Sequence, residues 1–398
     1  MKNSMENILK TEMKDELLNG ILPFWLQHAV DRENGGFYGK ISDDLVVCHD
    51  APKGGVLNAR ILWAYSAAYK MFGESDYKMM ADRAYDYTIE FLTDKDYGGI
   101  YWLVDSRGNP LDTRKQVYAQ AFAIYAFSEY YAATKETAAL ENAVALYELM
   151  EKHCYDHKYK GYFEACRQNW SPGGFYLDDK CGEEQKSMNT MLHVMEAYAN
   201  LYRVWRDGGL RKKLKETVEV MEEYVCDDET GHFKLFFDEK WNSLTDEYSY
   251  GHDIEGSWLL TEACEVLEDG GLLEKIKPAA LKMAEAVLSG GVDSDHGILY
   301  EGRAGGIIDS DRHSWPQAEA VVGFYNAYQL TGEEKFLTAA LNTWEFIKKH
   351  IIDHRYGEWY WGRKQNGETI NSDAKVDMWK CPYHNSRACM EILRRVIA

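Results

Sequence analysis

The sequence predicts an all-α protein, an (α/α)6 barrel in which six helical hairpins close into a toroid, with short extended turns between the repeats. Three observations lead to this prediction. A glycine-containing turn recurs six times along the 398 residues, the segments between the turns have helical periodicity, and only 7 residues are proline. Self-similarity at a regular interval is the signature of a repeat architecture.

The recurring turn is a glycine followed by aromatic or aliphatic residues. Aligned on one glycine in each unit, successive turns lie 63, 62, 70, 66 and 60 residues apart, so six units account for the whole chain. A closed ring is favoured over an open solenoid because no unit resembles a polar capping repeat. No linker rich in Pro, Gly or Ser interrupts the pattern, so we expect one catalytic domain spanning residues 1–398. The aligned glycines are Gly36, Gly99, Gly161, Gly231, Gly297 and Gly357.

Helical periodicity fills the segments between the turns. In NARILWAYSAAYKMFG (58–73), apolar residues fall at positions i, i+3, i+4 and i+7, as on the buried face of a helix. The segment that follows Gly73 has the same pattern, and a counterpart near the C-terminal end begins at Thr331. Each unit is therefore predicted to contain a helix, a turn, a second helix and a short extended turn.

Composition argues against several classes of protein. The formal net charge is −20 and the Lys and Arg residues are dispersed, which argues against nucleic acid or an anionic membrane as a partner. The N-terminal segment predicts a charged amphipathic helix without a signal-peptide core, and no apolar run approaches the roughly 20 residues that span a bilayer. The eight cysteines form no C-x-x-C pair. We therefore expect a cytoplasmic protein with reduced thiols, present as a monomer or a weak homodimer.

Polar and aromatic residues recur near the start of the first helix in each unit. Residues at the same position in each repeat of a closed toroid lie on one rim, so these helix N-termini should converge on a common cavity. Helix N-termini carry partial positive charge and free N–H groups, and these would face that cavity. Polar groups that converge on an aromatic-lined concavity are the default candidate for an active site. These residues are Arg60, Tyr118, Asn189, His193, His252, Glu255, Trp315, Glu319, Trp379 and His384.

The three histidines at this phase favour function, although a lone histidine near a helix start is more often structural. Arg60 could be a structural ion-pair partner, but in a cavity its planar fork can hold sugar oxygens or a developing oxyanion. Glu255 follows His252 by three residues and shares its helix face, so it could bind a hydroxyl group, orient an imidazole or cap a neighbour.

Tryptophans at this phase could belong to the core or could stack on pyranose faces. Trp315 and Trp379 are the better candidates for stacking. Trp258 is also predicted to bind substrate, although it lies six residues beyond His252 and deeper in its helix.

Metal and cofactor signals are weak. His252 and Glu255 are spaced like a ligand pair, but the rest of a zinc or di-iron set is missing: there is no H-E-x-x-H and no second Glu-x-x-His. No G-x-G-x-x-G motif in a strand–helix setting and no Walker loop occur, so a nucleotide cofactor has no support. We expect neither a metal nor a cofactor.

The residues at these positions resemble the N-acylglucosamine 2-epimerase superfamily, and within it the cellobiose 2-epimerases. The resemblance covers essentially the full length, and its most specific segments are YGHDIE and WKCPYHN. One departure is Ser314, which stands before Trp315 where many relatives carry a second aromatic residue. The matching segments are NGGFYG (34–39), the helix around Arg60, 118–127, MNTMLHVMEAY (188–198), YGHDIE (250–255), QAEAVVGFYNAYQ (317–329) and WKCPYHNSRACMEI (379–392).

This resemblance implies an (α/α)6 barrel and a reversible conversion of reducing-end glucose to mannose in β-1,4-linked disaccharides. It implies general acid and base roles for His252 and His384, and it places His193 and Arg60 around the reacting C1–C2 oxygens. It implies that the remaining residues bind or orient the substrate: Tyr118, Asn189, Glu255, Glu319, Trp315 and Trp379.

Proton transfer at C2 explains why histidines would be used. A group that titrates near neutrality can both give and take protons at physiological pH. Our hypothesis assigns His384 to remove the C2 proton and His252 to assist ring opening and return a proton, with Arg60 holding the enediolate. Two alternatives share the fold: a monosaccharide epimerase or aldose–ketose isomerase, and an (α/α)6 glycoside hydrolase. The hydrolase would need two carboxylates, which Asp253, Glu255 or Glu319 could supply. A third alternative is a non-enzymatic toroid that binds glycans or a protein.

Overall fold

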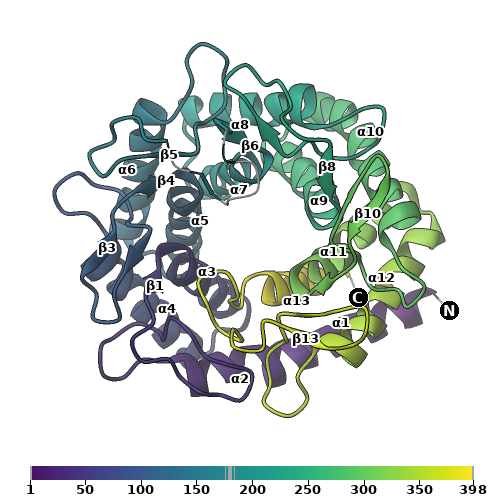
Figure 1. The fold of residues 1–398 in the computed structure, drawn as a ribbon, viewed down its shortest axis with the longest axis horizontal. Helices are drawn as coiled ribbons and strands as arrows, with labels where there is room; N and C mark the ends of the chain where they lie inside the picture. The colour runs from purple at the N-terminus through teal and green to yellow at the C-terminus, as the bar shows by residue number, and fades with distance from the viewer. Residues whose placement is uncertain (1, 175, 178–181, 183, 397–398) are drawn as a thin grey trace.

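The computed structural model describes residues 2–174, 176–177, 182 and 184–396, and it arranges them as a ring of helical hairpins (Figure 1). The inner wall of the ring consists of helices that begin on the same rim. This architecture confirms the predicted all-α (α/α)6 barrel. The inner helices are α3 (Gly55–Phe72), α5 (Val117–Thr134), α7 (Met188–Val204), α9 (Tyr250–Val266), α11 (Ser314–Thr331) and α13 (His384–Arg395).

The outer helices run back along the outside of the ring. Five of them follow the inner helix of their own hairpin: α4 (Ser75–Tyr87), α6 (Thr137–His153), α8 (Gly208–Val220), α10 (Gly270–Ala286) and α12 (Glu334–Phe346). Four of these continue into a π-helical turn: η3 (Thr88–Leu92), η4 (Met221–Val225), η5 (Val287–Gly291) and η6 (Ile347–Ile351).

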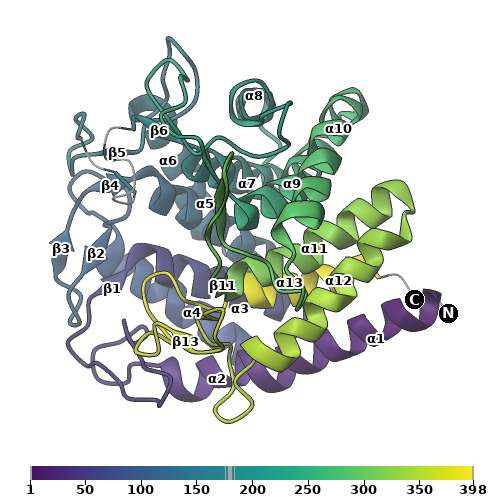
Figure 2. The same cartoon turned by 45° about the vertical axis from the view of Figure 1, so that its right-hand side comes forward.

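The sixth hairpin is assembled from the two ends of the chain. Its inner helix is α13, and its outer element is the N-terminal run of α1 (Lys2–Asp15), η1 (Glu16–Ile21), α2 (Leu22–Phe24) and η2 (Trp25–Ala29). Figure 2 shows α1 lying along α12 and α13, with the two ends of the chain close together. The Lys10 ammonium donates to the Val396 carbonyl over 2.7 Å. The ring is therefore closed by a pairing of its first and last helices.

Burial explains why the two layers have different sequence patterns. On α5, every residue from Val117 to Tyr130 is buried, because an inner helix is covered by its neighbours and by the outer layer. On α8, burial is restricted to one stripe that includes Leu210, Leu214 and Val218, and the remaining face carries Lys and Glu. An all-round apolar helix belongs in the interior and an amphipathic one at the surface.

Short antiparallel strands join neighbouring repeats at the rim where the inner helices begin. Each small sheet pairs the segment before one inner helix with the turn of the next repeat. The sheets are β1 (Lys53–Gly54) with β2 (Leu103–Val104) and β3 (Pro110–Asp112); β4 (Lys115–Gln116) with β5 (Ala165–Cys166); β6 (Lys186–Ser187) with β7 (Phe236–Phe237); β8 (Glu247–Ser249) with β9 (Glu301–Arg303) and β10 (Gly306–Asp309); and β11 (Arg312–His313) with β12 (Gly362–Arg363) and β13 (Thr369–Ile370).

A buried ion pair fastens the turn of most repeats to the strand that follows it. In the second repeat, Asp94 accepts from the backbone N–H groups of Asp96 and Tyr97, and its other oxygen accepts from Lys115 over 2.7 Å. Both partners are fully buried, so leaving either one unpaired would be costly. The same arrangement recurs as Lys53–Asp31, Lys186–Asp156 and Lys375–Asp353.

The backbone pairing corrects the alignment of the repeats. In every repeat an isolated antiparallel bridge pairs a residue before the turn with a residue after it. The residues after the turn are Phe37, Ile100, Tyr162, Phe233, Ile298 and Trp359. The residue that directly precedes this second bridged residue is glycine in four repeats, but it is His232 in the fourth repeat and Glu358 in the sixth. The alignment on Gly231 and Gly357 was therefore wrong by one residue, because those repeats keep only the first glycine of the turn.

Two expectations about the chain as a whole can be examined in its described part. Each described cysteine is a free thiol, and Cys181 lies outside the described residues. Among the described helices, none is both long enough and apolar enough to cross a membrane.

Candidate active site

The N-terminal ends of the inner helices surround a cavity of about 460 Å³. This volume lies within the range of pockets that hold small organic ligands. The sequence-predicted residues that line it are Arg60, Tyr118, Asn189, His193, His252, Glu255, Trp315, Trp379 and His384. The structure therefore brings together nine of the eleven predicted side chains, from six different helices or the loops before them.

Arg60 is held in place by its neighbours on the cavity wall. One guanidinium nitrogen donates to the Tyr118 hydroxyl over 2.7 Å, and another donates to the Trp379 carbonyl over 3.3 Å. The guanidinium also lies 4.2 Å from the centre of the Phe122 ring. Its Nε is buried and has no hydrogen-bond partner among the described residues.

His193 is oriented by a carboxylate one helical turn further along α7. Its Nδ1 lies 2.8 Å from Glu196, and its ring packs against those of Tyr118 and Phe122. Glu196 also accepts from Arg387 and from the Tyr383 hydroxyl. These donors outweigh the effect of burial and lower the pKa of Glu196 to about 2, so it is a carboxylate at neutral pH.

His252 lies in the first turn of α9. Ser249 caps this helix by accepting from the His252 backbone N–H, and the same hydroxyl lies 3.0 Å from Nδ1 of the imidazole. The Trp315 ring packs against His252 at 4.7 Å between centres and against His384 at 5.4 Å. Two imidazoles from different helices therefore meet at one indole.

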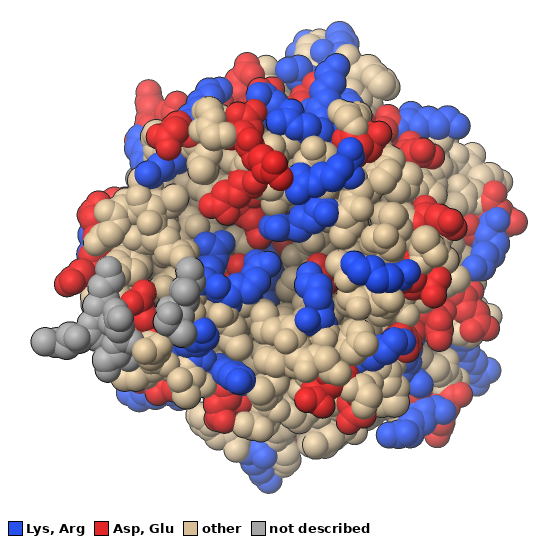
Figure 3. Space-filling view, turned by 180° about the vertical axis from the view of Figure 1, so that it is seen from behind, with Lys and Arg blue, Asp and Glu red and all other residues tan. Residues whose placement is uncertain are grey.

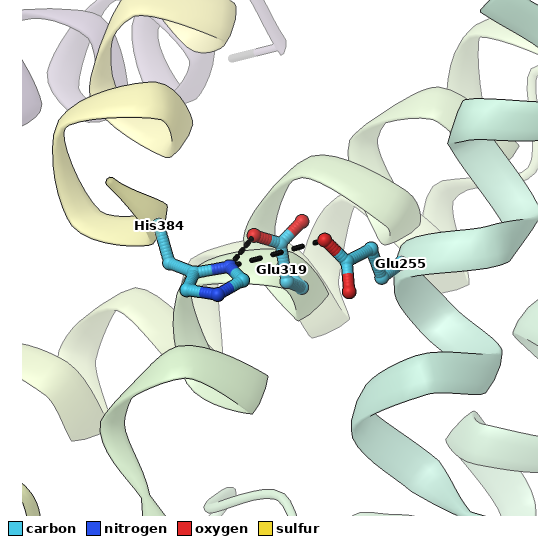
Figure 4. A group of neighbouring side chains, drawn as sticks. All are labelled: Glu255, Glu319 and His384. Atoms are coloured by element: carbon cyan, nitrogen blue, oxygen red, sulfur yellow. Dashed lines mark hydrogen bonds and ion pairs between the residues drawn. The ribbon is translucent and has the colours of Figure 1, made fainter. Parts of the chain in front are cut away.

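His384 is the first residue of α13, and its Nδ1 lies 2.6 Å from Glu319 of α11 (Figure 4). Burial and the nearby guanidinium groups of Arg60 and Arg387 lower the pKa of His384 well below its usual value. Arg387 and the Trp258 indole both donate to Glu319, which therefore accepts the Nδ1 proton of the neutral imidazole. The Nε2 lone pair is left as a base.

Arg387 connects the carboxylates beneath the cavity. Its guanidinium donates to Glu196, Glu255 and Glu319, which come from α7, α9 and α11. Burial and the neighbouring Glu319 raise the pKa of Glu255 to about 7. The second carboxyl oxygen of Glu255 has no hydrogen-bond partner among the described residues. Because Glu255 lines the cavity, its carboxyl group is a candidate to bind a substrate hydroxyl.

The ligand atoms of Glu255, Glu319 and His384 lie close enough together to hold a metal ion. The guanidinium of Arg387, however, binds both carboxylates, at 2.6 Å from Glu319. A metal ion would have to share these oxygens with a fixed positive charge. The donor set therefore fits an internal ion-pair network better than a metal centre.

Two predicted binding residues, Trp258 and Glu319, do not line the cavity. Trp258 is buried on α9, where its indole N–H donates to Glu319 over 3.1 Å and its ring lies 4.9 Å from the Arg387 guanidinium. The prediction that they contact substrate has no support from their positions. Both residues lie one layer below the cavity. Trp258 follows His252 by six residues, which places it almost two helical turns further along α9.

Several residues of the site were missed by sequence reasoning. A spacing signal could have identified the charged ones, Glu196 and Arg387, because each follows a histidine of the cavity by three residues on the same helix face, as the predicted Glu255 follows His252. Other missed residues also line the cavity, and no spacing rule marks them. They are Leu235, Phe236, Tyr300, Glu301, His313, Trp359, Trp361, Lys380, Cys381 and Asn385.

The opposite rim carries the C-terminal ends of the inner helices. Figure 3 shows Lys and Arg gathered around the centre of this rear face, interspersed with Asp and Glu. Basic residues occupy the last turns of α3, α7 and α13. They form ion pairs that include Lys70–Glu129 and Arg203–Glu262. Positive charge stabilises a helix at its C-terminal end, so the two rims are electrostatically different.

The fold and the site together define an (α/α)6-barrel enzyme with three histidines in an aromatic-lined cavity. The hydrolase alternative loses support here, since Glu255 is the only one of its three candidate carboxylates that lines the cavity. Asp253 is fully buried and is engaged by His232 and by the Phe233 backbone.

Comparison with known proteins identifies the family. The model of the N-acylglucosamine 2-epimerase (GlcNAc 2-epimerase) family matches residues 36–388. The chain is 47% identical to the cellobiose 2-epimerase of Bacteroides fragilis, covering 98% of this chain and 100% of that one. It is 40% identical to the cellobiose 2-epimerase of Dictyoglomus turgidum, covering 98% and 99%. The structure of cellobiose 2-epimerase from Bacillus thermoamylovorans superposes with a TM-score of 0.94 at 41% identity, covering 98% and 100%. The chain belongs to the N-acylglucosamine 2-epimerase family and is a carbohydrate epimerase.

Proposed function

We propose that the protein is a cellobiose 2-epimerase, which interconverts glucose and mannose at the reducing end of β-1,4-linked disaccharides such as cellobiose and lactose. The observation that carries this proposal is the meeting of His252 and His384 at Trp315 within one cavity. The identity with curated cellobiose 2-epimerases over the full chain supports the same substrate class.

The reaction begins with ring opening, because C2 of an aldose becomes acidic only when C1 is a free carbonyl. His252 takes the O1 proton as the C1–O5 bond breaks, and water protonates O5. His384 then takes the C2 proton on Nε2, and the electron pair of the C–H bond forms an enediolate. Protonated His252 returns its proton to the opposite face of C2. The ring closes on the epimer as O5 loses its proton to water and His384 gives its proton to O1, so both imidazoles end neutral.

Arg60 and Glu255 stabilise the reacting oxygens. The guanidinium of Arg60 is fixed before substrate binds, so it can stabilise the enediolate oxygen without reorganisation. Removing one such donor typically costs about 100- to 1,000-fold in rate. The unpartnered Glu255 oxygen accepts from a sugar hydroxyl, and its pKa of about 7 lets it also exchange a proton near neutral pH.

The outer cavity accommodates the second sugar. The Ser314 backbone N–H donates to the Trp361 carbonyl over 2.8 Å, and both residues line the cavity. We assign stacking on the distal sugar to Trp361 and stacking on the reacting sugar to Trp315 and Trp379. The reaction needs no metal or organic cofactor, and we place the protein in the cytoplasm as a monomer or weak homodimer.

The test is NMR of cellobiose incubated with the pure protein in D2O. We expect glucosyl-mannose carrying deuterium at C2. Unlabelled product would contradict proton abstraction, free glucose would indicate a hydrolase, and glucosyl-fructose as the main product would indicate an isomerase. His384→Asn should abolish the exchange at C2, whereas exchange that persists in this variant would contradict the assignment of the base. Parallel incubations with mannose and N-acetylmannosamine test the substrate class.

A further inference from the structure

The turn before each inner helix is nearly the same in all repeats, and the two exceptions precede His252 and His384. At the turn position defined by the isolated bridges, four repeats have glycine: Gly36, Gly99, Gly161 and Gly297. A Cβ atom on the first three would lie 2.4 to 2.6 Å from an aromatic ring. The fourth and sixth repeats carry His232 and Glu358 instead. Because the other repeats form this turn with glycine, the turn itself does not require a side chain at this position, and His232 and Glu358 need another explanation.

Glu358 adopts a backbone conformation that favours glycine. Its φ is +60°, in the left-handed region, and its carboxylate is fully buried. A non-glycine residue in this region costs of order 1–3 kcal/mol and persists where the surrounding structure enforces it. Glycine at this position would avoid both the backbone strain and the cost of burying a charge. We therefore expect the contacts of the Glu358 side chain to offset that free-energy cost.

The contacts of Glu358 show what this side chain does. One carboxylate oxygen accepts from the Lys380 ammonium and from the Asn385 side-chain amide, each over 2.6 Å. Lys380 and Asn385 bracket the short segment that ends in His384 at the start of α13. A single oxygen therefore holds both ends of the segment that carries the histidine. The other oxygen accepts from the Trp25 indole over 2.8 Å, which connects this segment to the N-terminal run of the ring.

His232 makes the corresponding contact in the fourth repeat. Its Nδ1 lies 2.7 Å from Asp253, which directly follows His252. The His232 ring is stacked on Tyr248, with 3.7 Å between centres, in the strand that leads into α9. Both exceptional side chains thus bind the residue immediately after a histidine of the cavity.

We infer that Glu358 is a positioning residue that sets the location of His384, and that His232 has the same task for His252. This inference rests on the proposed function, because it assumes that both histidines transfer protons. A displacement of about 1 Å in a reacting group can cost about 100-fold in rate. Loss of Glu358 should therefore lower kcat and leave KM nearly unchanged, since Trp315 lies on α11 and remains in place to bind sugar.

Glu358→Gly is the sharpest variant, because it installs the residue that four other repeats use at this position. We expect kcat for cellobiose and the rate of C2 exchange in D2O to fall about 10- to 100-fold, with KM within about threefold of the parent protein. Glu358→Gln keeps an acceptor oxygen of the same size and should restore part of kcat. Trp25→Phe is the matched control: it removes the third hydrogen bond to Glu358 but leaves both bonds to the His384 segment, and it should retain kcat within about threefold.

Two results would overturn the inference. One is a folded Glu358→Gly protein with kcat within threefold of the parent. The other is an equal loss of kcat in Trp25→Phe, which would indicate a general packing effect. If Glu358→Gly does not fold, Glu358→Gln decides: an unchanged kcat refutes the inference, and a loss of fivefold or more at unchanged KM supports it. His232→Gly should slow C2 exchange about tenfold, and retained exchange would refute its part. Failure of the proposed function is distinguishable, because the parent protein would then not exchange C2.

Discussion

The hydrogen bond between Glu319 and His384 offers the most direct test of how the site makes a base. In the proposed mechanism His384 becomes an imidazolium in the transition state, and its Nδ1 lies 2.6 Å from a carboxylate oxygen of Glu319. At an effective dielectric constant of ~20, two unit charges at this distance attract by about 6 kcal/mol. Arg387 shares the same oxygen at 2.6 Å, so we assign about half of this attraction to His384. Replacing Glu319 with Gln should therefore cost about 3 kcal/mol, or roughly 100- to 200-fold in kcat.

The assay is steady-state epimerisation of cellobiose together with C2 exchange in D2O. Glu319→Gln should lower both rates by the same factor and leave KM within about threefold, because Glu319 does not line the cavity. Trp258→Phe is the control, since it removes the indole N–H that donates to the other Glu319 oxygen over 3.1 Å and keeps an aromatic ring beside Arg387. We expect it to lose less than tenfold. A Glu319→Gln enzyme with kcat within threefold of the parent would refute the role of this carboxylate.

Two further predictions concern stability. Burial raises the pKa of Glu164 from 4.5 to about 7, so between these values the folded state binds more protons than the unfolded state and the free energy of unfolding falls as pH rises. Glu164→Gln should therefore add about 3 kcal/mol at pH 8 and nothing at pH 4 in urea titrations, and an equal gain at both pH values would contradict this account. Gly99→Ala should lower the free energy of unfolding by about 2–4 kcal/mol, because φ is +79° and the new Cβ would lie 2.5 Å from the Trp170 ring. Gly73→Ala, with φ +74° and open space, should lose only about 1–2 kcal/mol, and equal losses in the two variants would contradict the steric argument.

Much of the fold could be predicted because the repeats are regular and the layers have different periodicity. The inner helices are apolar all round, as α5 shows, and the turns are marked by glycine. The composition of the sixth hairpin could not be predicted in the same way. Its outer element stands at the opposite end of the chain, and no local pattern states that Lys10 lies beside Val396.

The sequence predicted the site residues that lie at the start of each inner helix, and it missed those that lie one turn further along the helix, below the cavity. The histidines lie within the first two turns of their helices, so the repeat places them on one rim. Arg387 lies one turn deeper than His384, where a charged residue in a sequence is usually taken as exposed. Only the structure shows that three carboxylates surround it. Trp258 was misplaced for the same reason.

The pairing of the first and last helices has a consequence for how the molecule is made. Helix α1 leaves the ribosome roughly 370 residues before α13. At synthesis rates of about 5–20 residues per second, its apolar face waits roughly 20 to 70 s for its partner. Leu9, Met13 and Leu17 are fully buried in the finished protein, so during this interval they form an aggregation-prone surface. The same late step adds His384, the residue proposed as the base, so a nascent chain completes the proposed active site only when the ring closes.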